Sequence, residues 1–341
     1  MRKICKAFLY YCESSSLNDA TNYYVGVIEK TLKKRNVELV KTQNLTELTG
    51  ADIIVTITAK AFFKAKCKNR KAKTFFWSQG VAAEEAIMNE KTLHNYYRYI
   101  CRFVLSFVAL HFADVIFLVS EEMRKHYRTM YLCKLDDAII MPCYNLPLST
   151  YFDLGQYRNP TFVYAGNAAA WQGVDLMLDV YALVERKLPN ARIVLLSKNE
   201  EEFKKKIAAR EIKNYSIKYV NMDDLQDELH KYKYGFILRD NHIVNRVATP
   251  TKMNSYLSNY LIPIFSNTVD DFNRYIQLDE FTIKAKYPLD AKKVAKQIID
   301  FENVSRDYSK YKIYVDNVFK RHYNDDTYIN TIDEKIKAWF Q

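Results

Sequence analysis

The sequence lacks a long hydrophobic run. No segment reaches the roughly 18 uncharged apolar residues that a membrane-spanning helix needs. The nearest one, residues 103–119, is interrupted by His111 and Asp114. The first residues, MRKICKAFLYYC, have a basic lead, but Lys6 interrupts their short apolar run, so they resemble a first core strand more than a signal peptide. We therefore expect a protein that does not span a membrane.

The cysteines form none of the familiar metal or redox motifs. No CxxC pair is present, and no histidine lies at ligand spacing to a cysteine. This pattern predicts reduced, buried thiols in the cytoplasm rather than disulfides, and it predicts no metal site. The six residues are Cys5, Cys12, Cys67, Cys101, Cys133 and Cys143.

Several catalytic and recognition motifs are also absent. The chain has no HExxH, no defensible Ser/His/Asp arrangement, no GxGxxG and no DxD pair near a strand end. It has no internal repeat at solenoid spacing and no low-complexity tract. No zinc-finger spacing or RNP motif accompanies its basic residues, so nucleic acid is not an expected partner.

Positive charge is in excess and unevenly distributed. The chain has 51 Lys and Arg against 40 Asp and Glu, and residues 1–150 hold 22 of the basic and 14 of the acidic side chains. Such a basic half favours anionic partners. Its densest part, KAFFKAKCKNRKAK from Lys60 to Lys73, has seven basic residues and no acid. It could contact an anionic membrane at about 1 kcal/mol per cation, or form a solvated basic face.

The length of 341 residues favours two domains. Apolar segments alternate with amphipathic ones, which predicts strands at residues 7–12, 37–40, 52–58, 73–79, 114–120 and 137–142, with a helix capped by Ser120. The alternation pauses at residues 143–160 and resumes with strands at 161–166, 191–197, 216–220, 234–238 and 261–266. Continuous apolar strands between helices indicate parallel sheets covered on both faces. We expect an α/β protein with two doubly wound domains at residues 1–150 and 151–306, followed by helices at 307–341.

The strip FILRDNHIVNRVATPTK, residues 236–252, leaves one predicted strand and enters a helix. Ligands bind at such carboxyl ends of parallel strands. Thr249 could cap the helix and Pro250 suits its first turn. Together with the helix N-terminus, Arg239, Arg246 and Lys252 could form a diphosphate site. The alternative is a surface loop whose arginines pair with local acids.

Two further strips have the same position after a strand. YAGNAAAWQG, residues 164–173, has small residues that would let a ligand approach the backbone at Gly166. WSQGVAAEEAI, residues 77–87, has Gln79 and Gly80 at a strand end, and its Glu84 and Glu85 open the next helix, where the helix dipole favours acids.

These strips together resemble the nucleotide-sugar-dependent glycosyltransferases with the GT-B fold, in particular the large retaining group of bacterial surface-polysaccharide synthesis. The resemblance rests on WSQGVAAEE, ADVIFLVSEEMRKHY with IIMPCYN, YAGNAAAWQG and GFILRDNHIVNRVATPTKMNSYLSNYLIPIFS, and covers nearly the whole chain. It implies two Rossmann-like domains, with the donor mainly on the second and the acceptor mainly on the first. The final helices would cross back to the first domain.

The resemblance also implies the site and the reaction. The chain would transfer a sugar from a nucleotide sugar, which is its substrate, and would need no metal and no cofactor. The acceptor would be a glycan or a lipid-linked glycan in capsule, exopolysaccharide or related surface-glycan synthesis, at the inner membrane face. It leaves room for an oligomer or a partner glycosyltransferase. The catalytic residues would be Arg239, Lys252 and Gln79, and the acceptor side would include Ser14–Asn18 and Gly80. Donor binding would fall on Gly166, Asn167, Arg239, Asn245, Arg246, Thr251 and Lys252.

The sequence departs from that family at two places. The family often has two glutamates eight positions apart, and here those positions are Val247 and Ser255, or Ala248 and Tyr256 with a shift of one residue. Where basic residues are usual after the first strand of the second domain, this chain has Asn167 and Gln172. An inactive partner subunit and a GT-B sugar-nucleotide epimerase therefore remain as alternatives.

Overall fold

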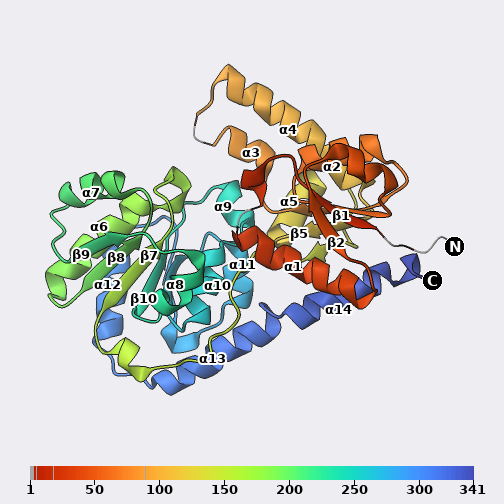
Figure 1. Cartoon of the computed structure of the whole chain (residues 1–341). Coiled ribbons are helices and arrows are strands. Elements are labelled where there is room, and N and C mark those ends of the chain that lie inside the picture. The colour runs from red at the N-terminus through yellow and green to blue at the C-terminus, as the bar shows by residue number, and fades with distance from the viewer. Residues whose placement is uncertain (1–3, 5, 18, 89) are drawn as a thin grey trace. The chain divides into compact units, whose positions relative to one another are not determined.

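The computed structural model describes residue 4 and residues 6–17, 19–88 and 90–341, without the side chains of Asp19, Ala20 and Ala170 (Figure 1). Cys5, one of the predicted thiols, and Asn18, the last residue of the predicted acceptor-side segment Ser14–Asn18, lie outside the described residues. Contacts divide the chain into two compact units. Unit 1 comprises Met1–Asn145, Val247–Thr249 and Asn324–Gln341, and unit 2 comprises Leu146–Arg246 and Pro250–Tyr323.

Unit 1 is built on a six-stranded parallel sheet in the order β2-β1-β3-β4-β5-β6. The six strands lie where apolar runs predicted them, and β3 is buried at all four positions. Isolated apolar runs of this kind specify fully buried parallel strands. The strands are β1 (Ala7–Tyr10), β2 (Leu39–Thr42), β3 (Ile53–Thr56), β4 (Lys73–Ser78), β5 (Val115–Leu118) and β6 (Ile139–Ile140).

Helices connect these strands. The predicted Ser120 cap is confirmed, because its Oγ accepts the Met123 N–H at 3.0 Å. The chain end adds α14 to this unit, where Arg35 of α1 donates two hydrogen bonds to Asp333. The helices are α1 (Asp19–Lys34), α2 (Ala59–Lys68), α3 (Ala82–Ala86), α4 (Leu93–Phe112), α5 (Glu121–Tyr131) and α14 (Asp325–Ile336).

Unit 2 has the same plan, with a six-stranded parallel sheet in the order β12-β11-β10-β7-β8-β9. All five predicted strands are confirmed, and β12 is an additional edge strand. The strands are β7 (Thr161–Ala165), β8 (Arg192–Leu196), β9 (Tyr215–Lys218), β10 (Tyr234–Ile237), β11 (Ile262–Ser266) and β12 (Ile283–Ala285). Strands β11, β10 and β7 are adjacent in the middle of this sheet. The strands that border the candidate donor segments are therefore neighbours.

The helices of unit 2 include a packing contact that holds this part of the sheet together. Tyr256 lies over Gly235 of β10, where an added Cβ would come within 2.3 Å of its ring, and its hydroxyl accepts the Ala165 N–H at 3.1 Å. The helices are α6 (Val174–Lys187), α7 (Glu200–Ala208), α8 (Met222–Leu229), α9 (Ile243–Val247), α10 (Thr251–Ser258), α11 (Asp270–Tyr275), α12 (Ala291–Glu302) and α13 (Tyr308–Arg321). In the described part of the chain, no helix combines the length and the apolar character needed to cross a membrane.

Candidate functional site

The charged strip at residues 236–252 is more ordered than the loop that its sequence predicts. It contains a short helix, α9, between the end of β10 and the start of α10. His242 explains where α9 begins, because its Nδ1 accepts the Val244 N–H at 3.2 Å and its carbonyl accepts the Asn245 N–H at 2.9 Å. The hydrogen bonds of His242 therefore fix the conformation of the backbone between Arg239 and Lys252.

The predicted cap at Thr249 is wrong. The hydroxyl of Thr249 accepts the N–H of Cys143 at 2.9 Å, and Pro250 stands at the N-cap of α10 without a side-chain cap. The first turn of α10, from Thr251, thus has no side-chain cap on its N–H groups, as an anion-binding helix start requires.

Arg239 is held in place at the carboxyl end of β10. Its N–H donates to Ser266 Oγ at 2.9 Å, the same hydroxyl donates to the Arg239 carbonyl at 2.9 Å, and its Nη1 donates to Asn245 Oδ1 at 3.1 Å. The residue is only 7% exposed. Burial lowers the pKa of Arg239 to about 10, while Tyr164 acts weakly in the opposite direction. The guanidinium is thus a fixed cation with amide and hydroxyl neighbours.

Lys252 lies close to Arg239, on the first turn of α10. Its Nζ donates to Gln172 Oε1 at 2.8 Å and lies 5.1 Å from the centre of the Tyr164 ring. Burial, followed by repulsion from Arg239, lowers the pKa of Lys252 well below its usual value. Lys252 is half-buried, and an added anion would stabilise the charge of a lysine that lies next to a second cation.

Gly166 is the third part of this arrangement. A Cβ at Gly166 would lie 2.9 Å from both Cε and Nζ of Lys252. The side-chain end of Lys252 therefore occupies the space beside Gly166, whereas the sequence predicted that this small residue would make room for a ligand.

The predicted donor residues divide into two groups. The structure brings Gly166, Arg239, Asn245 and Lys252 together. Arg246 is exposed on α9 and donates to Asn241 Oδ1 at 3.4 Å, with no contact to Arg239 or Lys252 among the hydrogen bonds of the described residues. Thr251 is partly buried at the start of α10, and Asn167 is an exposed residue whose Oδ1 accepts the Ala169 N–H.

No ion pair joins Arg239, Arg246 or Lys252 to an acid among the residues that the structure describes. The alternative of a surface loop with arginines paired to local acids is therefore not what these residues form. Tyr164, Gln172 and Ser266 were missed as members of the site. Their sequence signal is weak, since each becomes relevant only through a partner far along the chain.

A second candidate site lies wholly within unit 1. A cavity of about 340 Å³ opens where β1, β3 and β4 end, and its wall contains Gln79 and Gly80 together with part of the predicted Ser14–Asn18 segment. Hydroxyl groups predominate among its polar lining residues, which are Ser15, Ser16, Thr21, Thr58, Ser78, Gln79, Glu85 and Ser106.

Gln79 and Glu85 are the two groups of this cavity with chemical interest. Gln79 Oε1 accepts the hydroxyl of Tyr24 at 2.9 Å, and its buried Nε2 has no partner among the described residues. Glu85 Oε1 would lie 2.4 Å from a Cβ on Gly80. Loss of hydration raises the pKa of Glu85. A spare amide donor and a carboxyl group thus face a cavity rich in hydroxyls.

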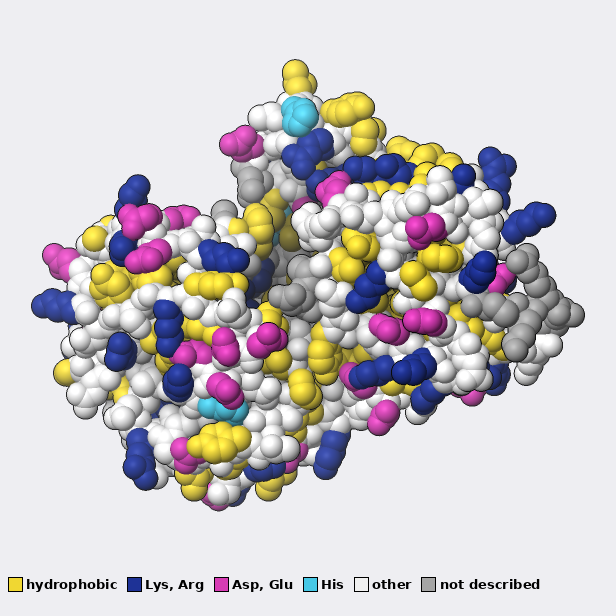
Figure 2. Space-filling model, in the orientation of Figure 1, with side chains coloured by type: hydrophobic (Ala, Val, Ile, Leu, Met, Phe, Trp, Pro, Cys, Tyr) yellow, Lys and Arg dark blue, Asp and Glu magenta, His cyan; other side chains and the backbone are white. Residues whose placement is uncertain are grey.

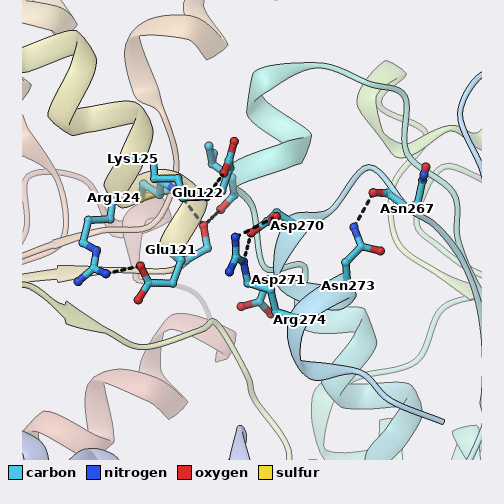
Figure 3. Close-up of polar contacts among 12 residues, drawn as sticks. Glu121, Glu122, Arg124, Lys125, Asn267, Asp270, Asp271, Asn273 and Arg274 are labelled. Atoms are coloured by element: carbon cyan, nitrogen blue, oxygen red, sulfur yellow. Dashed lines mark hydrogen bonds and ion pairs between the residues drawn. The ribbon is translucent and has the colours of Figure 1, made fainter. Parts of the chain in front are cut away.

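Other acidic pairs near strand ends have structural partners. Figure 3 shows Glu121 with Arg124 at the start of α5, and Asp270 with Arg274 on α11. Glu84 pairs with His126. The helix-start position expected for Glu84 and Glu85 is confirmed in α3, and Asp270 and Asp271 lie likewise in the first turn of α11. Within the described ranges, no cluster of three or more His, Cys, Asp or Glu side chains is arranged to hold a metal ion.

The two positions at which the family often has glutamate are not open to the solvent. Val247 is fully buried. Ser255 is buried too, and its hydroxyl donates to the Thr251 carbonyl at 3.1 Å. A donor that binds here would have to be held by other side chains.

No family model matches the chain, and no curated protein matches it. Solved structures do match. The chain is similar to Anabaena HepE in complex with UDP and glucose, with a TM-score of 0.65 and 12% identity over 98% of this chain and 100% of HepE. It is similar to the lipopolysaccharide outer core galactosyltransferase WaaB, with a TM-score of 0.67 and 11% identity over 98% of this chain and 99% of WaaB.

Longer proteins are similar as well. For S. aureus TarM in complex with UDP, the TM-score is 0.61 and the identity 9% over 83% of this chain. The chain spans only 55% of the length of TarM and 57% of the matched chain of the GtfA/B complex. At such identities the likeness establishes the fold alone. The chain has the GT-B fold, with two Rossmann-like units that are each built on a parallel sheet.

Proposed function

We propose that this protein is a glycosyltransferase that binds a nucleotide sugar on unit 2. The observation that supports the proposal best is the pair formed by Arg239 and Lys252, two cations without an acidic partner among the described residues, next to the carboxyl ends of neighbouring strands. A diphosphate would relieve their mutual repulsion. The UDP complexes of the structural neighbours HepE and TarM support a nucleoside diphosphate as the anion.

The residues of unit 2 would act on the leaving group. When the bond between the sugar and the diphosphate breaks, negative charge builds up on the diphosphate, and fixed cations stabilise it most in a site that is poorly hydrated. Arg239 would serve as the oriented donor, because Asn245 and Ser266 already fix it. Lys252 would supply the second charge, and the uncapped first turn of α10 would add N–H groups. Since these cations could stabilise the leaving diphosphate, we propose a transfer that needs no metal. The family resemblance alone supports a retaining transfer.

The acceptor would bind to unit 1. Its cavity offers hydroxyls, the free amide of Gln79 and the carboxyl of Glu85, which are the groups that hydrogen-bond to a sugar. We propose a glycan or lipid-linked acceptor of bacterial surface-glycan synthesis. The enzyme would act in the cytoplasm at the inner membrane face, where residues 60–73 would contact anionic lipid.

Two single substitutions test the donor site. Arg239→Ala and Lys252→Ala should each remove a charge-assisted contact, so turnover of a nucleotide sugar should fall by about 10-fold to 100-fold. The thermal shift that UDP or UDP-glucose produces in the wild type should shrink in parallel. Lys292→Ala, an exposed lysine on α12, is the control and should behave like the wild type. Unchanged turnover in both variants would refute the diphosphate site.

The buried Val247 and Ser255 favour a second candidate, an inactive glycosyltransferase-like subunit that positions an active partner. The GtfA/B complex among the structural neighbours supports this class of assembly. This candidate predicts no thermal shift with any nucleotide or nucleotide sugar, together with stable co-purification with an active homologue. A shift that is lost in Lys252→Ala would exclude it.

A further inference from the structure

Helix α4 exposes an unusual number of large apolar side chains. Along its 20 residues most of them recur every three or four positions and therefore lie on one face. Leu93 is 91% exposed, Tyr97 67% and Ile100 60%. The apolar face of α4 consists of seven exposed residues, which are Leu93, Tyr96, Tyr97, Ile100, Val104, Phe107 and Phe112.

The surroundings of this face are basic. No Asp or Glu occurs between Lys91 and Ala113, or between Lys60 and Lys73. Figure 2 shows hydrophobic and basic side chains next to one another over the part of unit 1 that contains α4 and α2. Phe63 of α2 adds another exposed ring.

Most of the cations here are not neutralised by acids. In α2 and the residues that follow it, Lys60 pairs with Glu13, while Lys66 and Lys73 pair with Asp114. For the others, no ion pair is found among the described residues. These exposed cations are Lys64, Lys68, Arg70, Lys71, Lys91 and Arg98.

We propose that the apolar face of α4 docks in the surface of an anionic lipid bilayer, with the cations of α2 and α4 on the lipid headgroups. A helix of 20 residues is about 30 Å long, which is enough to lie in the interface as a monotopic anchor. Tyr96 and Tyr97 are suited to that boundary because each has an apolar ring and a polar hydroxyl. The proposal extends the basic contact at residues 60–73 to an inserted apolar surface.

A second copy of this chain is the other occupant to weigh. A symmetric dimer through this face would bring the same patch of both copies together. The unpaired cations would then face each other without acids, which disfavours the contact. The anionic headgroups of a bilayer complement the same charges, so the charge pattern favours lipid.

The inserted side chains are tested by vesicle sedimentation. The wild type should bind vesicles of phosphatidylglycerol mixed with phosphatidylcholine, and bind phosphatidylcholine alone at least tenfold more weakly. Ile100→Asp should weaken binding to the mixed vesicles by about tenfold or more, because it removes an inserted side chain and adds a repelled charge. Ile313→Asp is the matched control: Ile313 on α13 is 58% exposed, and its variant should bind like the wild type.

The cations are tested separately. Lys64→Gln with Lys68→Gln should weaken binding by about fivefold for each charge removed, and high salt should do the same to the wild type. Lys292→Gln with Lys293→Gln on α12 is the matched control. Circular dichroism melts check that each variant is folded.

Two results would overturn the proposal. One is a wild type that does not bind anionic vesicles, or an Ile100→Asp variant that binds them like Ile313→Asp. The other is a wild-type dimer in sedimentation equilibrium that Ile100→Asp dissociates, which would assign the face to a second copy. The inference rests on the proposed function only because the proposed reaction explains why the protein would be at a membrane. Vesicle binding requires no turnover, so its failure is distinguishable from failure of the donor site.

Discussion

The candidate sites of the two units occupy the same position, after a strand and at the start of a helix, but they contain different kinds of side chain. In unit 2, the segment after β10 and the start of α10 provide Arg239 and Lys252, both with lowered pKa values. In unit 1, the segment after β4 and the start of α3 provide Gln79 and Glu85, and Glu85 has a raised pKa. We therefore expect the first site to bind an anion and the second to bind neutral hydroxyl groups. A repeated fold fixes where a site lies, and local side chains decide what it binds.

The surroundings of one glycine near each site show that the two sites also differ in rigidity. In unit 2, Gly173 has a φ of +65°, and its added Cβ would lie 2.3 Å from the carbonyl oxygen of Leu238, which is backbone. In unit 1, Gly80 has the free end of the Glu85 side chain at 2.4 Å. A side chain can rotate away, whereas the end of a central strand cannot. The cationic site is therefore built on fixed backbone, and the neutral one has a wall that can move.

Gly173→Ala should have the largest effect. The substitution combines a left-handed backbone with a backbone clash, so we expect unit 2 to lose about 3 kcal/mol or more of unfolding free energy. Chemical denaturation monitored by circular dichroism measures the loss. Gly26→Ala in α1 is the control, since no atom lies within 4 Å of its added Cβ, and it should gain about 0.5–1 kcal/mol. Equal stability of the two variants would show that the carbonyl of Leu238 can move.

The lowered pKa of Lys252 predicts two opposite effects of rising pH, a weaker donor binding and a higher stability, both of intermediate size. Donor binding needs the charged lysine, so it should weaken, by about tenfold, as pH rises through the folded pKa. Stability should rise over the same range, because the unfolded chain keeps its proton to higher pH than the folded one. Titration calorimetry with UDP and thermal melts from acidic to alkaline pH measure the two trends.

Lys252→Met is the variant that sharpens this comparison. It should flatten both trends, bind UDP weakly at every pH, and melt at a higher temperature than the wild type near neutral pH. Glu85→Gln in unit 1 is the control and should leave the pH dependence of UDP binding unchanged. A wild type whose UDP affinity does not fall anywhere between acidic and alkaline pH would contradict the assigned charge of Lys252.

The sequence predicts the fold well because its signals are local. Strands such as β3 and β10 are uninterrupted apolar runs, and the Ser120 cap acts three residues away. The site is harder to predict because its contacts are long-range. Thr249 bonds to a residue 106 positions earlier, and Lys252 to one 80 positions earlier. A pattern read along the chain contains neither contact, so it assigned Thr249 to a cap and missed Gln172.

Irregular elements show the same limit. The edge strand β12 has three residues, one of them Lys284, and α9 has five residues within a charged strip. Neither is long enough to display a period of 2.0 or 3.6 residues. Both depend on tertiary neighbours, and α9 depends on the hydrogen bonds of His242. Prediction from the sequence therefore weakens at the strand ends, where the candidate sites lie.

Gly80→Ala should have the smallest effect, and it isolates the acceptor side. The new methyl group would push the carboxyl of Glu85 away from the cavity wall, so the acceptor KM should rise about threefold to fivefold with little change in kcat, as loss of one or two hydrogen bonds predicts. Glu85→Gln keeps the shape of the side chain and polar groups that can hydrogen-bond to a sugar, so it should change KM less. The UDP-induced thermal shift should be unchanged in both. Gly50→Ala, with no atom within 4 Å of its Cβ, is the control for a harmless added methyl group. A Gly80→Ala enzyme with weakened UDP binding and an unaltered acceptor KM would reverse the assignment of the two sites.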